Sequence, residues 1–279
     1  MKLAIISDIH GNVPALHAIT NHLEAWQPDR VIVNGDVVNR GPNSVPCWEF
    51  VAQKRRDSGW FVTKGNHEDF VLSYRTRPPN NHSHGIHRHA SWTFAQLTDY
   101  LDALDALPDT ISLTDPDGSE VRITHASMLG NRKGIYIDTP EERVQELIAP
   151  APPLFCTSHV HWPLLRQVGG TCIARSGSVG SPRDGDWRGS YLQISWQQTK
   201  WHVEVLRIPY DRDATDRDYH QIGYLAEGGP VAQLIYHEWK TALPVLAPWQ
   251  RQYQEAVLAG EIGLETAVNR YLQANGLLP

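Results

Sequence analysis

The sequence predicts an α/β protein, because short apolar strands alternate with amphipathic helices through much of its 279 residues. Residues 2–7 form an apolar run that ends in polar residues, and apolar side chains at helical spacing follow over residues 13–26. A β-branched run at residues 31–33 begins a second unit of the same kind. In open α/β sheets ligands bind at the carboxyl ends of strands, so the polar residues after each strand are the first candidates for a site.

Composition and charge limit the domain organisation and the classes of function that the chain can have. With 41% hydrophobic residues, the chain can bury one large core and a small appended unit. A net charge of -6 argues against non-specific binding of nucleic acid. The three cysteines are far apart and odd in number, which favours free thiols in a reducing compartment. No apolar run is long enough for a membrane span or a signal peptide, so we expect a cytoplasmic protein with no membrane partner.

The first third of the chain pairs strands with helices. Asn12 is expected to cap the first helix, and Pro14 lies in its first turn. The expected strands are residues 2–7, 31–33 and 60–63, and the expected helices are residues 13–26 and about 46–56.

An insertion is expected between about residues 70 and 109. Residues 75–86 are rich in Pro, Asn and Gly, which favours a loop over the active site, followed by a helix at about residues 90–106. This region carries His82, His84, His87 and His89. A metal site here is disfavoured because no cysteine or carboxylate is interleaved with the histidines.

The rest of the chain divides into a strand-rich part and a helical part. Strands are expected at residues 110–113, 120–124, 154–157, 164–168, 171–174, 191–196 and 201–208. A capping box at residues 139–142 is expected to open a helix that ends near residue 148. Helices are then expected at residues 217–226, 231–241, 249–258 and 265–274. We therefore predict a main domain at 1–208 and a helical extension at 209–279, packed on it through Trp239, Trp249, Tyr253 and Tyr271.

Metal-ligand side chains follow five of the predicted strands. Each alone has an ordinary explanation, since a strand-end Asp often caps a turn and a buried His is often part of the core. Together they supply two carboxylates, four imidazoles and an amide oxygen, which suits two adjacent divalent ions with nitrogen and oxygen ligands. The candidates are Asp8, His10, Asp36, Asn66, His125, His159 and His161. Arg40 lies four residues after Asp36, and its guanidinium group can grip phosphate oxygens in a bidentate way.

The order of five motifs resembles the calcineurin-like metallophosphoesterase superfamily. The motifs are SDIHGN, GDVVNRGP, KGNHED, THAS and SHVHWP, and the resemblance covers residues 1 to about 208. A later run, GSVGSPRDGD followed by SYLQI, resembles the bacterial phosphodiesterase branch. The resemblance implies a sandwich of two mixed β-sheets flanked by helices, with a dinuclear metal centre at the strand ends.

The resemblance also assigns roles to the candidate residues. One ion would be held by Asp8, His10 and His161, the other by Asn66, His125 and His159, and Asp36 would bridge both. The two ions, which could be manganese, iron or zinc, would lower the pKa of a shared water, so that a bridging hydroxide attacks phosphorus. Arg40 would stabilise the phosphoryl oxygens, and His67 would serve as an acid or hydrogen-bond donor.

Two positions depart from the pattern of the superfamily. Ser158 replaces a glycine without affecting the two histidines that follow it. Asn39 stands where related phosphoprotein phosphatases have an aspartate that pairs with the motif histidine, so an amide would hold His67 here. An amide stabilises the protonated imidazole less than a carboxylate does.

Several functions fit these motifs. We expect a phosphodiesterase acting on a small phosphoester, nucleotide-derived substrates included, because beyond Arg40 the motifs offer only Arg175 and Arg183 to bind a dianionic monoester. The alternatives are a phosphomonoesterase, a protein phosphatase among them, or a dinucleoside polyphosphate hydrolase. A non-catalytic binding scaffold of the same fold is a further class, and the complete set of ligands argues against it. The oligomeric state is left open.

Overall fold

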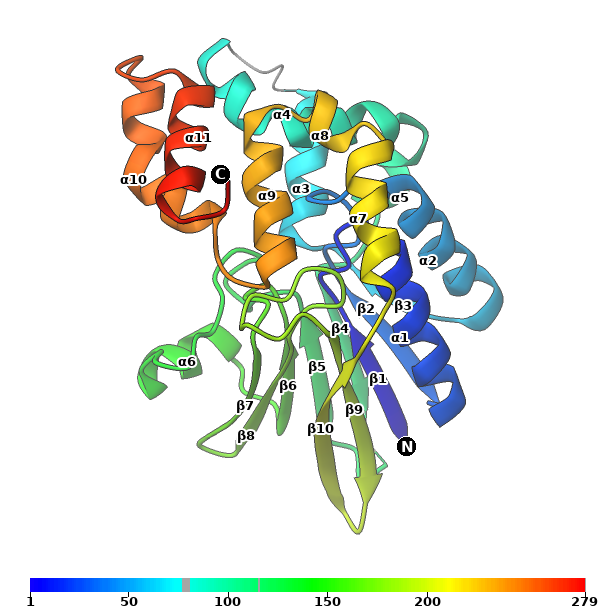
Figure 1. Cartoon of the computed structure of the whole chain (residues 1–279). Coiled ribbons are helices and arrows are strands. Elements are labelled where there is room, and N and C mark those ends of the chain that lie inside the picture. Colours follow the sequence, from blue (N-terminus) through cyan, green and yellow to red (C-terminus); the bar gives the residue numbers. More distant parts are fainter. Residues whose placement is uncertain (77–80, 115, 279) are drawn as a thin grey trace.

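The computed structural model describes residues 1–76, 81–114 and 116–278, with side chains described again from residue 85 onward (Figure 1). Two mixed five-stranded β-sheets form its centre, which confirms the predicted sandwich. The first sheet has the strand order β10-β9-β1-β2-β3 and the second the order β4-β5-β6-β8-β7. The strands of the first sheet are β1 (Lys2–Ile6), β2 (Arg30–Asn34), β3 (Phe61–Thr63), β9 (Gly189–Gln197) and β10 (Lys200–Ile208). Those of the second are β4 (Thr110–Thr114), β5 (Glu120–Thr124), β6 (Leu154–Thr157), β7 (Pro163–Val168) and β8 (Thr171–Ser176).

Parallel pairing gathers the strand ends that matter for the site. β1, β2 and β3 are parallel to one another, and so are β5, β6 and β8. Apolar side chains from the facing sides of the two sheets fill the space between them, among them Leu3, Ile5, Ile123 and Leu154, which are all fully buried. Burial of this kind fixes the register of β1, β5 and β6, since a slip of one residue would turn their apolar side chains outward.

Helices cover the outer faces of the sheets. The helix α1 (Val13–Trp26) begins as predicted, since the Asn12 side chain accepts a hydrogen bond from the backbone of Ala15 at 3.1 Å. The helix α2 (Ser44–Ser58) lies beside it on the first sheet (Figure 1). On the second sheet α6 (Glu141–Ile148) lacks the predicted capping box: Pro140 is the N-cap and makes no side-chain cap. The Thr139 hydroxyl instead accepts a hydrogen bond from Tyr136 at 2.8 Å.

The insertion is helical, and the prediction of a loop over residues 75–86 is wrong where the structure describes them. The segment contains α3 (Asn66–Leu72), a 3₁₀ turn at Ser73–Arg75, α4 (Asn81–Gln96), a 3₁₀ turn at Thr98–Tyr100 and α5 (Leu101–Asp105). In α4, Ile86, His89, Ala90 and Thr93 are buried, at helical spacing. Packing of this face outweighs the loop-like composition of the sequence. Residues 77–80 of the predicted loop lie outside the described residues.

The C-terminal region consists of helices, as predicted. These are α7 (Arg212–Gln221), α8 (Tyr224–Glu227), α9 (Pro230–Thr241), α10 (Leu246–Leu258) and α11 (Leu264–Ala274). The first begins five residues earlier than predicted and is followed by a break at Gly223, whose φ of +92° suits glycine. Trp239, Trp249 and Tyr271 pack in one cluster with Ile86 of α4, so the aromatic residues join the helices to the insertion. In Figure 1, α9 lies over the sheet edge where the loops gather.

The cysteines and the lengths of the described helices bear on the expectations from composition. Cys47, Cys156 and Cys172 are free thiols, as the sequence predicts. Within the described residues, no helix has the length and apolarity that crossing a membrane requires.

Candidate metal centre

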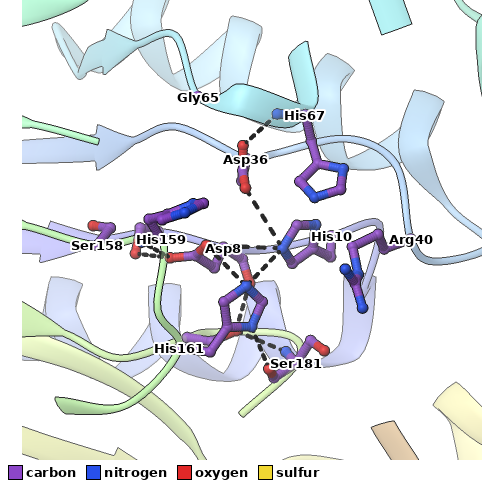
Figure 2. Close-up of polar contacts among 12 residues, drawn as sticks. Asp8, His10, Asp36, Arg40, Gly65, His67, Ser158, His159, His161 and Ser181 are labelled. Carbon is purple, nitrogen blue, oxygen red and sulfur yellow. Dashed lines mark hydrogen bonds and ion pairs between the residues drawn. The ribbon is translucent and has the colours of Figure 1, made fainter. Parts of the chain in front are cut away.

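Seven predicted ligands meet at one edge of the two sheets. Asp8 follows β1, Asp36 follows β2, and Asn66 opens α3 just after β3. His125 follows β5, while His159 and His161 follow β6. Figure 2 shows how the side chains of Asp8, His10 and His161 converge, with Asp36 and His67 beside them.

The first group of ligands contains Asp8, His10 and His161. The Nε2 atom of His161 lies 3.1 Å from Asp8 Oδ1 and 3.2 Å from the Nε2 atom of His10. The Nε2 atom of His10 lies 3.8 Å from the same carboxylate oxygen. These three donor atoms therefore surround one point, as the resemblance implied.

The second group contains Asn66, His125 and His159. The Oδ1 atom of Asn66 lies 2.7 Å from His159 Nδ1 and 3.1 Å from His125 Nε2. Asp36 connects the two groups, because its Oδ2 atom lies 3.3 Å from His125 Nε2 and 3.8 Å from His10 Nε2. This intermediate position is what a carboxylate shared by two ions requires.

Two orphaned oxygens show that the donor set fits cations. Asp8 Oδ1 and Asp36 Oδ2 are buried and have no hydrogen-bond partner among the residues that the structure describes. A buried carboxylate oxygen without a partner is costly, so a buried acid normally has a hydrogen bond or a metal. Here the neighbouring atoms are imidazole nitrogens and an amide oxygen, which together with carboxylates suit manganese, iron or zinc.

Three of the candidate imidazoles are held so that Nε2 faces the centre. The Nδ1 atoms of His10 and His125 lie 3.1 Å and 2.8 Å from the backbone oxygens of Asn39 and Asn34. His161 Nδ1 lies 2.5 Å from the oxygen of Ser181. Because a carbonyl only accepts, each of these Nδ1 atoms carries a proton, and Nε2 is the nitrogen that faces the centre.

Burial and nearby carboxylates determine the protonation states of the candidate ligands. Burial lowers the pKa of His10 to about 3 and that of His159 to about 4, so both imidazoles are neutral at physiological pH. Burial also lowers the pKa of His125, but Asp36 and Asp8 outweigh it and raise the value to about 10. In the metal-free chain a proton on His125 therefore neutralises Asp36, and a cation would have to displace it.

Strained backbone accompanies the ligands. Asp8, His10, Asp36, His159 and His161 all have left-handed φ angles between 49° and 71°. Residues other than glycine adopt this region rarely, and each instance costs about 1 kcal/mol or more. The strained backbone of these loops lowers the stability of the fold locally, and it directs several side chains toward one point. Such strain is typical of functional sites.

Glu68 is a site residue to which the sequence reasoning assigned no role. Its buried carboxylate accepts hydrogen bonds from the backbone nitrogens of Asp36, Val37 and Gly65, each at 2.8 Å. It thereby fixes the loop that carries Asp36. Gly65 is required at the same place, because a Cβ atom there would lie 2.2 Å from Asp36 Oδ1. In the sequence, Glu68 could have been recognised as a site residue because it directly follows the Asn66-His67 pair of the motif.

The two predicted catalytic residues lie beside the ligands. His67 Nδ1 lies 3.0 Å from the side-chain nitrogen of Asn39, so an amide does hold the imidazole, as predicted. Arg40 lines the same pocket, and its Nη2 atom bonds to Glu238 of α9. Of the two other arginines considered, Arg183 lines the pocket with Arg40, whereas Arg175 is buried among backbone carbonyls.

A pocket of about 330 Å³ opens beside the ligands. Helices from the insertion and the C-terminal region form its outer wall, which contributes Ile86 and His87 from α4, Val231 from α9, and Leu246 and Gln250 from α10. The prediction that the histidine-rich segment faces the site is thus confirmed for His87 and His89, although the segment is a helix. No group of metal-ligand side chains includes either histidine in the described part of the chain.

The two-sheet fold and its carboxylate and imidazole donors define a metallophosphoesterase. The model of the calcineurin-like phosphoesterase family matches residues 1–192, and the chain belongs to this family of phosphoester hydrolases. Membership implies that divalent metal ions take part.

The chain is also similar to a curated protein and to solved structures. An uncharacterized protein of Methanocaldococcus jannaschii is 27% identical over 225 residues, which cover 75% of this chain and 88% of that protein. The crystal structure of a metallophosphoesterase from Sphaerobacter thermophilus has a TM-score of 0.63 and 25% identity, covering 82% of this chain and 99% of that one. A hypothetical protein from Pyrococcus horikoshii has the same fold, with a TM-score of 0.69 and 16% identity, and covers 84% and 97% of the two chains.

Proposed function

We propose that the protein is a dinuclear metal-dependent phosphodiesterase acting on small phosphodiesters, nucleotide-derived ones included. Asp8, His10 and His161 would hold one ion, and Asn66, His125 and His159 the other, with Asp36 shared. The observation that carries the proposal is the pair of orphaned carboxylate oxygens, Asp8 Oδ1 and Asp36 Oδ2, each among neutral or displaceable imidazole donors beside an arginine-lined pocket. The free thiols support a reducing compartment, and we place the protein in the cytoplasm.

When bound, the ions would supply the Lewis acidity that activates water for attack on phosphorus. The chain's own residues would do the rest. Arg40 and Arg183 would bind the phosphoryl oxygens and stabilise the charge that they gain in the transition state. His67, which Asn39 orients, would donate a proton or hydrogen bond to the departing oxygen.

The shape of the pocket supports a diester. A phosphodiester carries a second organic group, and the outer wall provides apolar contacts for it from Ile86, Val231 and Leu246, with Gln250 as a polar neighbour. The wall comes from the insertion and the C-terminal helices, so these regions would contact the organic group. A phosphomonoesterase is the second candidate, because Arg183 beside Arg40 places a second cation where a dianion would bind.

Substrate class can be measured with model esters. We expect kcat/KM for bis(p-nitrophenyl) phosphate to exceed that for p-nitrophenyl phosphate when manganese is present, because the apolar residues of the outer wall would contact the second substituent. Both esters release the same chromogenic leaving group, so the comparison isolates the other substituent. A clear preference for the monoester would contradict the diester assignment and support the phosphomonoesterase.

A further inference from the structure

A carboxylate from the C-terminal region lies among the arginines of the pocket. Glu238 belongs to α9 and is only 1% exposed. Its Oε1 atom forms ion pairs with Nη2 of Arg40 and with Nε of Arg183, the latter at 2.9 Å. The two arginines come from loops more than 140 residues apart in the sequence and meet at this one oxygen.

The other oxygen of Glu238 is bonded to the backbone. Oε2 accepts hydrogen bonds from the nitrogens of Val245 and Leu246, at 3.0 Å and 3.1 Å. The carboxylate is therefore fixed between α9 and the start of α10. Burial opposes its ionisation, but Arg183 and Arg40 outweigh this effect and hold the pKa of Glu238 at about 2. Glu238 is thus charged throughout the physiological range.

The arrangement leaves the arginine pair with one net positive charge. Two guanidinium groups share one carboxylate, and both line the pocket beside His67 and His161. Within the described part of the chain, Arg40 Nε and Arg183 Nε are buried and make no hydrogen bond, so Arg183 contacts Glu238 as an ion pair without hydrogen-bond geometry. Arg132 also lines the pocket but is exposed, so solvent screens its charge.

We propose that Glu238 is a specificity-determining residue, which positions Arg40 and Arg183 and sets their combined charge to suit the single negative charge of a phosphodiester group. The inference rests on the phosphoesterase function proposed above. A dianionic monoester would gain more than a monoanionic diester from a doubly charged arginine pair. Neutralising one arginine through Glu238 removes this advantage.

The test is the substitution Glu238→Gln, which keeps the shape of the side chain and an oxygen for the backbone of α10. The variant leaves two positive charges in the pocket. A monoester carries one more negative charge than a diester. The ratio of kcat/KM for p-nitrophenyl phosphate to that for bis(p-nitrophenyl) phosphate should therefore rise about tenfold. This is the order of magnitude expected when one additional unit charge on the substrate interacts at close range with one additional positive charge in a partly screened site. Loss of positioning would lower both activities and leave their ratio unchanged.

Binding gives a second readout that does not depend on turnover. In calorimetry with the manganese-loaded protein, Glu238→Gln should strengthen binding of inorganic phosphate relative to dimethyl phosphate, at a pH where phosphate is a dianion. The matched control is Glu120→Gln, which removes an ion pair with Arg122 at the amino-terminal end of β5. In this control, the monoester-to-diester ratio of kcat/KM and the ratio of the affinities for inorganic phosphate and dimethyl phosphate should both equal the wild-type values.

The reciprocal variant keeps the inference testable if Glu238→Gln does not fold. Arg183→Gln removes one positive charge, so the monoester-to-diester ratio should fall below that of the wild type. Ratios that stay unchanged in a folded Glu238→Gln variant, or in Arg183→Gln, would overturn the role of Glu238. Inactivity of the wild type toward both esters would instead overturn the proposed function.

Discussion

Replacing Asp36 with Asn is expected to remove both metal ions and nearly all activity. Asp36 Oδ2 lies between the two groups of ligands, 3.3 Å from His125 Nε2 and 3.8 Å from His10 Nε2. The substitution removes the charge that both ions would share, and metal affinity should fall by more than about 100-fold, the upper end of the cost of losing an outer-shell partner. Elemental analysis of the dialysed variant, with hydrolysis of bis(p-nitrophenyl) phosphate, checks this result.

The fold should survive this change. Asn can still accept the hydrogen bond that the backbone nitrogen of His67 donates to Asp36 Oδ1 at 2.8 Å. Asp29→Asn is the matched control, because Asp29 is an exposed acid just before β2. It should retain metal and activity. Full metal content in Asp36→Asn would show that Asp36 does not bridge the ions.

Arg40→Ala should slow hydrolysis by about 10²- to 10³-fold, the usual cost of removing one donor that stabilises charge in a transition state. Its metal content should be that of the wild type. Arg40 bonds to Glu238 and lines the pocket, and its guanidinium group stays protonated and offers no lone pair to a metal. Single-turnover rates together with metal analysis separate the two effects.

Arg188→Ala is the matched control for Arg40→Ala. Arg188 also belongs to an ion pair, with Asp186, but it is exposed and outside the pocket. Its loss should change neither rate nor metal content, as is usual for surface ion pairs. If Arg40→Ala released the metals, the arginine would act on the structure of the centre and not on the substrate.

Sequence patterns were sufficient for the centre of the fold. Strands such as β1 and β2 are apolar runs that end in polar turns, and Asn12 caps α1 as its residue type predicts. The candidate ligands could be predicted because parallel strands deliver their polar residues to the same edge. Local signals failed at the start of α4, where burial of Ile86 and His89 stabilises a helix that the composition of residues 75–86 does not favour.

Polar contacts between residues far apart in the chain could not be predicted from local sequence patterns. Glu238 lies in a charged stretch, HEWK, and pairs with Arg40, which is 198 residues away. One signal was available: Val231, Leu234 and Glu238 recur at helical spacing, so the acid falls on the apolar face of α9. A charge on such a face is costly unless a partner neutralises it, but the sequence does not identify the partner.

The number of ions bound per chain tests the central claim most directly. Metal-free protein would be titrated with manganese, and the bound ions counted by elemental analysis and located by anomalous diffraction. We expect two ions per chain at saturation, on either side of Asp36, with activity that appears only as they bind. One ion, or none, in a fully active protein would contradict the account.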